Sequence, residues 1–226
     1  MENTKYRILI VDENQEQIDD FVTFFETISD DFEVISISSL DNENDLFPII
    51  VNNEVDAVAF DYKLKENNST FAKNGDAYQN ILLDNFESFP TFIITNNAAD
   101  SRSMNTDPFK VIDKRIINYN SDDAEQKLEA NELIEKIKLS IDKYKENLQS
   151  YENELYSLIE RQGKGDVLSE EDLLRMIELD NKLENSISKK SSIPKEWKSP
   201  AGLQAITDLV NNSQDILAEL KKLNDE

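Results

Sequence analysis

The first 120 residues alternate short apolar runs with segments whose apolar residues recur every three or four positions. Runs of this length that are apolar throughout predict strands buried on both faces, and the intervening spacing predicts helices. Strands are expected over residues 6–11, 33–37, 55–60, 90–95 and 109–113. Helices are expected at Ile18, Phe21, Val22, Phe25 and Ile28, over 76–86, and more weakly over 41–52. This alternation indicates an α/β domain with a parallel sheet that is covered on both faces.

The second half of the chain has a different pattern, typical of long helices. A heptad-like series predicts one helix over 123–162. Its apolar positions are Ala130, Ile134, Ile137, Ile141, Tyr144, Leu148, Tyr151, Leu155 and Leu158. After "GKG", Ser169 and an S-x-x-D capping pattern begin a helix over 169–190, and Ser199-Pro200 begins a third over 200–223. The three helices can form a hairpin or bundle within the chain, or a coiled coil that joins two chains as a homodimer; the pattern permits both.

These two patterns divide the chain into an α/β domain at residues 1–120 and a helical extension at residues 121–226. The composition then excludes several function classes. A net charge of −23 argues against a nucleic-acid partner, because phosphate binding needs clustered Lys and Arg. The absence of Cys and His excludes thiol nucleophiles, imidazole metal sites and phosphohistidine on this chain. No apolar run is long enough to span a membrane and no signal pattern begins the chain, so we expect a cytoplasmic protein.

Polar residues that can carry chemistry stand at the ends of the predicted strands. Asp12 and Glu13 follow the first strand and Asp61 follows the third, in a stretch that has no basic residue between Arg7 and Lys63. Clustered carboxylates raise each other's pKa unless a cation lies among them, and Mg²⁺ prefers such oxygen ligands. One of the carboxylates would then be free to act as a nucleophile toward a phosphoryl group. Taken alone, Asp12 and Glu13 equally suit the cap and first turn of a helix.

A hydroxyl and an ammonium group complete this set, since Thr95 ends the fourth strand and Lys114 follows the fifth. In order along the chain, the five residues resemble the receiver domain of two-component response regulators, over roughly residues 5–120. The resemblance implies a doubly wound, flavodoxin-like sheet with strand order 2-1-3-4-5. It also implies that Asp61 in "AFD" is the phosphoacceptor, that Asp12, Glu13 and Asp61 hold Mg²⁺, that Thr95 is the switch hydroxyl, and that Lys114 contacts the phosphoryl group.

The chain departs from the family pattern at several positions around this set. Lys65 stands where a proline is usual, Asn96 replaces a small residue after Thr95, and Arg115 follows Lys114 in place of proline. Val111 stands where an aromatic switch residue is common, and the segment up to Pro108 has the pattern of a loop. We therefore expect the phosphoryl chemistry to be kept and the usual relay from Thr95 to an aromatic side chain to be absent.

The function that the resemblance implies is acceptance of a phosphoryl group on Asp61, with Mg²⁺, from a partner histidine kinase or phosphotransfer protein. Turnover would be limited to self-catalysed phosphorylation and dephosphorylation, and output would pass through protein–protein contacts. The variant receiver with helical tail also resembles receiver proteins of bacterial two-component-like defence systems. Two alternatives stay open: a phosphorylation-independent scaffold that acts through its helices, and a Mg²⁺-dependent phosphatase or nuclease. The identity of the kinase and of the output partner is not encoded in any motif.

Overall fold

The computed structural model describes residues 5–65, 70–96, 107–118, 122–164 and 166–187. The chain forms two compact units, residues 1–147 and residues 148–226, and each is described by itself. No helix in the described ranges is both long enough and apolar enough to cross a membrane.

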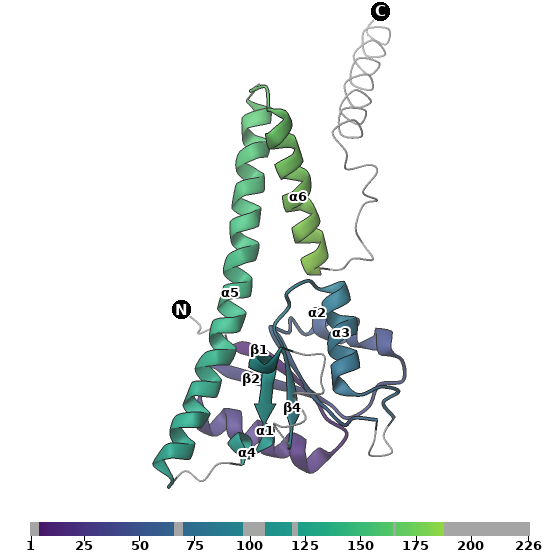
Figure 1. The fold of residues 1–226 in the computed structure, drawn as a ribbon, viewed down its shortest axis with the longest axis vertical. Helices are drawn as coiled ribbons and strands as arrows, with labels where there is room; N and C mark the ends of the chain where they lie inside the picture. The colour runs from purple at the N-terminus through teal and green to yellow at the C-terminus, as the bar shows by residue number, and fades with distance from the viewer. Residues whose placement is uncertain (1–4, 66–69, 97–106, 119–121, 165, 188–226) are drawn as a thin grey trace, which may run out of the picture. The chain divides into compact units, whose positions relative to one another are not determined.

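The first unit is built on a five-stranded parallel sheet, shown in Figure 1. Its strands are β1 (Tyr6–Val11), β2 (Phe32–Ile37), β3 (Ala57–Asp61), β4 (Thr91–Thr95) and β5 (Val111–Asp113). They pair in the order β2-β1-β3-β4-β5, and every pair is parallel. This is the doubly wound, flavodoxin-like order, so the predicted fold class is confirmed.

Side chains alternate between the two faces of the sheet, as the period of two requires. On β1, Ile8 and Ile10 belong to one apolar cluster and Leu9 and Val11 to the other, and all four are fully buried. Both faces are therefore covered, which explains why the strand sequences are apolar throughout and do not alternate with polar residues.

Short helices cover the sheet between the strands. They are α1 (Gln15–Ile28), α2 (Leu46–Asn52) with the 3-10 turn η1 (Glu43–Asp45) before it, α3 (Gly75–Asn85) and α4 (Lys114–Ile117); a 3-10 turn η3 (Pro108–Lys110) precedes β5. In Figure 1, α2 and α3 lie on one side of the sheet, and α1 and α4 lie on the other. The predicted helix positions agree, including the weak segment 41–52, where Pro48 lies in the first turn of α2.

The long helix α5 (Ala124–Gly163) belongs to the sheet unit over its first half. Its buried residues there join α1 in the cluster over one face of the sheet; they are Ala130, Leu133, Ile134, Ile137 and Ile141. The compact unit therefore ends at residue 147, whereas the sequence pattern set the domain boundary at 120. The two positions differ because a helix packed on a sheet and a helix in a coiled coil both repeat apolar residues every three or four positions, so the pattern does not distinguish them.

In the second unit, the end of α5 and α6 (Glu170–Ile187) form a helical hairpin. Arg175 binds Glu154 across the hairpin at 2.7 Å, and Leu158 and Leu179 are buried. The predicted cap is present, because the backbone N–H of Asp172 donates to Ser169 Oγ and the Asp172 carboxylate accepts the backbone N–H of Ser169, each at 3.1 Å. The predicted third helix, 200–223, lies outside the described residues.

Candidate functional site

Four polar side chains gather where the carboxyl ends of the parallel strands meet. Asp12 directly follows β1, Asp61 and Thr95 are the last residues of β3 and β4, and Lys114 directly follows β5. All four are buried, with Asp12 0% and Lys114 6% exposed. Only seven polar or charged residues are buried in the described part of the chain, and four of them lie at this edge. Buried polar groups at strand ends of an open α/β sheet are the expected mark of a site.

Lys114 connects two carboxylates that are distant in the sequence. Its Nζ lies 3.0 Å from Asp12 Oδ2 and 2.7 Å from Asp61 Oδ1. Both distances are those of charge-assisted hydrogen bonds, which are stronger in a buried environment than in water. Two carboxylates and one ammonium group leave the cluster with one excess negative charge, which favours the approach of a further cation.

Local turns fix the orientation of the two carboxylates. The second oxygen of Asp12 accepts the backbone N–H of Asn14 at 2.9 Å, and Asn14 in turn caps α1 through Glu16 N–H. The second oxygen of Asp61 accepts the backbone N–H of Lys63 at 2.7 Å. Each carboxylate is thus held from one side by its own backbone and from the other by Lys114, so the site is preorganised.

The position of Lys114 follows from the short helix that begins with it. Asp113 caps α4, because its carboxylate accepts the backbone N–H of Arg115 at 2.9 Å. Ile117 of this helix is buried in the apolar cluster beneath. The end of β5 and the anchored turn of α4 therefore direct the lysine stem toward β1 and β3.

The electrostatics of the site follow from burial opposed by ion pairing. Burial raises the pKa of Asp12 to about 6, and the nearby Asp61 carboxylate acts in the same direction, while Lys114 and the backbone N–H of Asn14 oppose the rise. Burial alone would lower the pKa of Lys114. The attraction and hydrogen bonding of Asp61 and Asp12 outweigh that effect and raise it, so the lysine is charged at neutral pH.

Gly75 is a site residue that the sequence patterns did not single out. A Cβ at this position would lie 2.1 Å from the backbone oxygen of Asp61 and 3.0 Å from Phe60 Cβ. The first turn of α3 therefore rests directly on the backbone of the central carboxylate. The backbone N–H of Gly75 also donates to the Tyr62 carbonyl at 3.0 Å. The signal was a glycine as the first residue of a helix, directly after the cap Asn74, where its low helix propensity makes other residues more usual.

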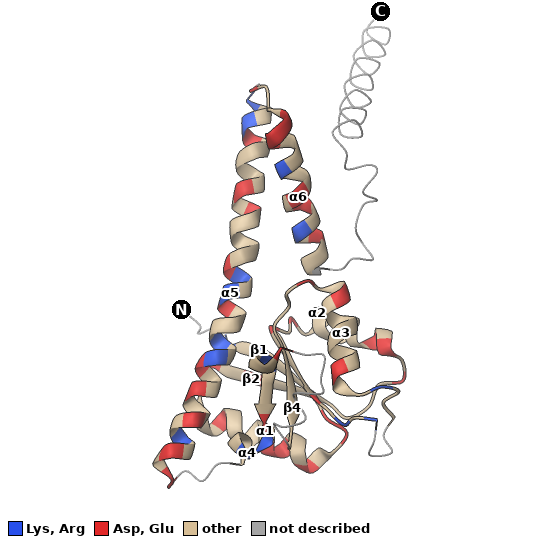
Figure 2. Cartoon of the chain, viewed as in Figure 1, with Lys and Arg blue, Asp and Glu red and all other residues tan. Residues whose placement is uncertain are grey.

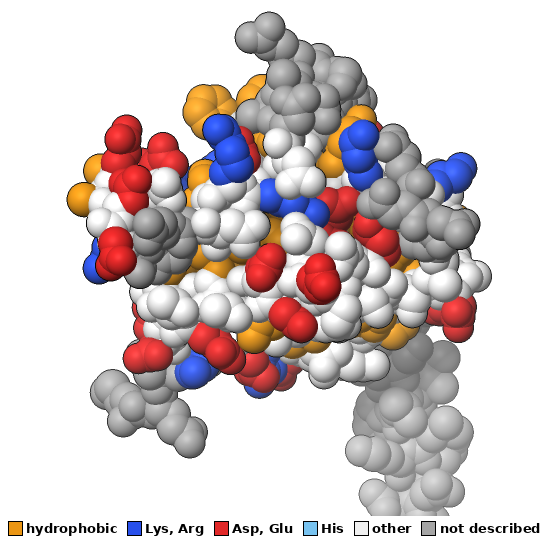
Figure 3. Space-filling view, turned by 90° about the horizontal axis from the view of Figure 1, so that it is seen from below, with side chains coloured by type: hydrophobic (Ala, Val, Ile, Leu, Met, Phe, Trp, Pro, Cys, Tyr) orange, Lys and Arg blue, Asp and Glu red, His pale blue; other side chains and the backbone are white. Residues whose placement is uncertain are grey.

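The remaining predicted residues lie around this center. Thr95 is buried at 3% exposure and pairs in register with Asp113, while Glu13 is half-buried beside Asp12. Three departures from the family pattern lie around the site, where Lys65 and Asn96 are exposed and Arg115 pairs with Asp113 at 2.6 Å. The fourth, Val111, begins β5 and packs against an apolar cluster. Figure 3 views the end toward which β4 points and shows basic and acidic side chains side by side near its middle.

The donor chemistry of the site suits a small hard cation. Asp12 and Asp61 lie close enough together to share the Lys114 ammonium group, and Mg²⁺ is usually held by one or two carboxylates together with waters. Within the described ranges, no three acidic, His or Cys side chains lie close enough together to hold a metal ion between them. The two carboxylates therefore fit an ion that keeps much of its hydration.

The comparisons with known proteins add little to this geometry. No protein-family model matches the chain, and no curated protein matches it. Among solved structures, one similar chain is described as the trimeric coiled coil of yeast Spc42 fused to another structure. The alignment covers 73% of this chain and 95% of that one, with 14% identity and a TM-score of 0.46. A likeness this low supports no inference about function.

Proposed function

We propose that the protein is a receiver that accepts a phosphoryl group on Asp61 from the phosphohistidine of a partner histidine kinase or phosphotransfer protein. One observation carries the proposal: a buried lysine from the end of β5 contacts the carboxylates of Asp12 and Asp61 from the ends of β1 and β3. The chain has no histidine, so the phosphoryl donor must be another molecule.

The proposed reaction is a transfer between two residues. An oxygen of the Asp61 carboxylate attacks phosphorus, a P–O bond forms, and the P–N bond to the donor imidazole breaks. The Lys114 ammonium pairs with a phosphoryl oxygen, and the buried Thr95 hydroxyl donates a hydrogen bond to another. Asp12 and Asp61 would hold Mg²⁺ together with waters, and Glu13 is the third ligand that the family resemblance implies. When bound, the ion supplies positive charge that offsets the negative charge of the phosphoryl group.

Phosphorylation with a small donor tests this proposal directly. The whole chain is incubated with acetyl phosphate and Mg²⁺, and its intact mass is measured. We expect the mass of one phosphoryl group to be added to the wild-type chain and to Asp84→Asn, which alters an exposed carboxylate on α3. Asp61→Asn should gain none. Equal labelling of Asp61→Asn would show that the acceptor lies elsewhere.

A second candidate function is a phosphorylation-independent scaffold that joins two chains through the helical hairpin. The observation that favours it is the exposure of large apolar side chains in the second unit, with Tyr156 at 70%, Val167 at 96% and Leu174 at 52%. Sedimentation of the wild-type chain and of Tyr156→Glu separates the two functions. A dimer that Tyr156→Glu disrupts, together with no phosphorylation of Asp61, would favour the scaffold.

A further inference from the structure

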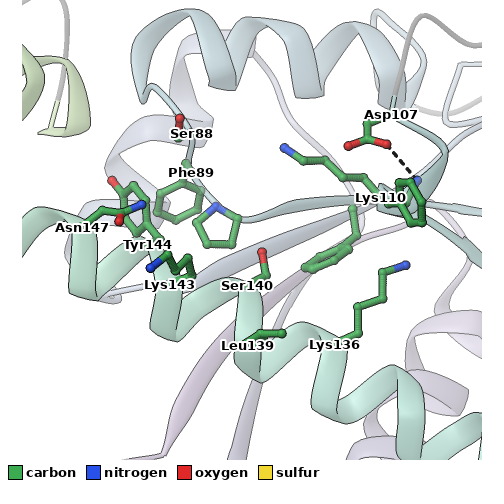
Figure 4. A pocket seen from close by; sticks show the side chains of 13 residues that line it. Ser88, Phe89, Asp107, Lys110, Lys136, Leu139, Ser140, Lys143, Tyr144 and Asn147 are labelled. Atoms are coloured by element: carbon green, nitrogen blue, oxygen red, sulfur yellow. Dashed lines mark hydrogen bonds between the residues drawn. The ribbon is translucent and has the colours of Figure 1, made fainter.

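A second concave surface lies on the first unit, at the opposite ends of β4 and β5 from the carboxylate site. It is a groove of about 450 Å³ between the amino-terminal ends of these strands and the middle of α5 (Figure 4). We call it the lysine groove, and its main residues are Phe89, Phe109, Lys110, Lys136, Leu139 and Lys143. Its volume lies in the range of surfaces that bind ligands or peptide side chains.

The groove combines a firm apolar wall with exposed apolar side chains. Phe89 is buried and packs edge-on against Tyr144 of α5, with ring centroids 5.5 Å apart. Phe109 and Leu139 also line the groove but are 80% and 70% exposed. Large apolar side chains gathered in a concavity, beside residues fixed in the core, are typical of a surface that a partner covers.

Three lysines surround this apolar surface, and among the described residues that line it Asp107 is the one carboxylate. In Figure 4, Lys136 and Lys143 lie on α5 on either side of Leu139 and Ser140, and Lys110 and Asp107 lie across the groove. Within the described ranges Lys110 and Lys136 make no ion pair, and Lys143 has only a long contact of 3.6 Å with Glu146. Partial burial lowers the pKa of Lys136, and Asp107 opposes this change.

This concentration of positive charge stands out in a chain whose net charge is −23. Figure 2 shows acidic residues on most elements, with many of the basic residues along α5. An acidic partner is repelled by the surface as a whole and attracted at the groove, since screening confines each effect to about 8 Å at physiological salt. Charge therefore selects both the partner and its place of contact.

We propose that the lysine groove docks an amphipathic helical segment of a partner protein, with apolar side chains entering the groove and carboxylates facing its lysines. A helix that presents anchors at positions i, i+3 and i+4 offers both features on one face. Three lysines are too few to track a nucleic-acid backbone, and a concave surface does not suit a flat bilayer. The proposal does not depend on phosphorylation of Asp61.

Selection of peptides on the whole chain tests the proposal. A displayed library of random peptides about four helical turns long is panned on the wild-type protein, and affinities of the selected peptides are measured. We expect peptides with Asp or Glu and with Leu or Phe at helical spacing. Leu139→Asp and Lys143→Glu should each weaken their binding by at least about tenfold.

Two variants on the same helix serve as matched controls. Leu128→Asp and Lys127→Glu change exposed residues of α5 outside the groove, and they should leave peptide affinity unchanged. The proposal is overturned if no peptide is selected, if the selected peptides lack acidic residues, or if the control variants weaken binding equally. Groove-dependent binding of a single-stranded oligonucleotide or of phosphatidylglycerol vesicles in place of peptides would also overturn it.

Discussion

At the scale of single residues, Lys114 controls the charge balance of the carboxylate site. It is the cation that contacts both Asp12 and Asp61, and all three side chains are almost completely buried. Buried ion pairs add little net stability compared with apolar residues, but removal of one partner leaves a charge that nothing compensates. The lysine therefore compensates the two buried carboxylates, and under the proposed function it would also pair with an incoming phosphoryl group.

Removal of this ammonium group should destabilise the protein at neutral pH. We expect Lys114→Met to lower the free energy of unfolding by about 3 kcal/mol, because two buried carboxylates lose their common partner. Urea denaturation at pH 7 measures the change. Lys127→Met, which alters an exposed lysine of α5, should stay within about 0.5 kcal/mol of wild type. Equal stability of the two variants would contradict the role assigned to Lys114.

Asp12 should make stability depend on pH. The pKa of this carboxyl is about 6 in the folded protein and about 3.9 in an unfolded chain. A pKa raised by folding contributes stability that is complete below pH 4 and is lost as the pH rises through 6. Without Mg²⁺, the stability of Asp12→Asn relative to wild type should therefore increase between pH 4 and 6, by about 2 kcal/mol. Denaturation in EDTA at each pH measures this, and a constant difference would refute it.

At the scale of elements, the site depends on how α3 and α4 meet the strand ends. The first turn of α3 rests on the backbone of Asp61 through Gly75, and α4 begins with the lysine itself. Neither helix is held there by high intrinsic propensity, since α4 has only four residues. Packing against the sheet positions both, so small changes at these contacts should be felt at the site.

Gly75 offers the sharpest test at this scale. Gly75→Ala should lower the free energy of unfolding by about 1–3 kcal/mol, because its Cβ meets backbone atoms that must shift. Thermal or urea denaturation measures the loss, and phosphorylation by acetyl phosphate should slow as Asp61 moves. Gly163→Ala is the matched control: nothing lies within 4 Å of a Cβ there, so stability should be unchanged or slightly higher. Similar losses in both variants would show that the contact at Gly75 has no special importance.

At the scale of the whole molecule, the sequence pattern anticipated the sheet better than the division into units. Apolar runs placed the strands, and the carboxylates and lysine stand at their ends as expected. The contact of one Nζ with both Asp12 and Asp61 was not predictable, because it depends on a side-chain conformation. The position of α5 was not predictable from periodicity either. Apolar residues such as Ile137 recur at the same spacing whether the helix packs on a sheet or in a coiled coil.

The extent of the first compact unit leads to a prediction about truncated chains. A chain of residues 1–147 should unfold cooperatively and accept phosphate from acetyl phosphate, because it retains the apolar face of α5. A chain of residues 1–120 loses that helix and exposes the apolar cluster around Ile8 and Phe92, so we expect it to aggregate or remain unfolded. Circular dichroism and denaturation distinguish the two. A well-folded 1–120 chain would instead support the domain boundary at residue 120 that the sequence pattern predicts.

The central claim is that Asp61 is the phosphoacceptor, and chemical mapping of the acyl phosphate tests it most directly. The whole chain is phosphorylated with acetyl phosphate and Mg²⁺, reduced with borohydride, digested, and sequenced by mass spectrometry. Borohydride converts an aspartyl phosphate to homoserine, which marks the acceptor permanently. The account predicts homoserine at position 61 alone, with none at position 12. Homoserine at another position, or none in a chain that has gained phosphate, would contradict it.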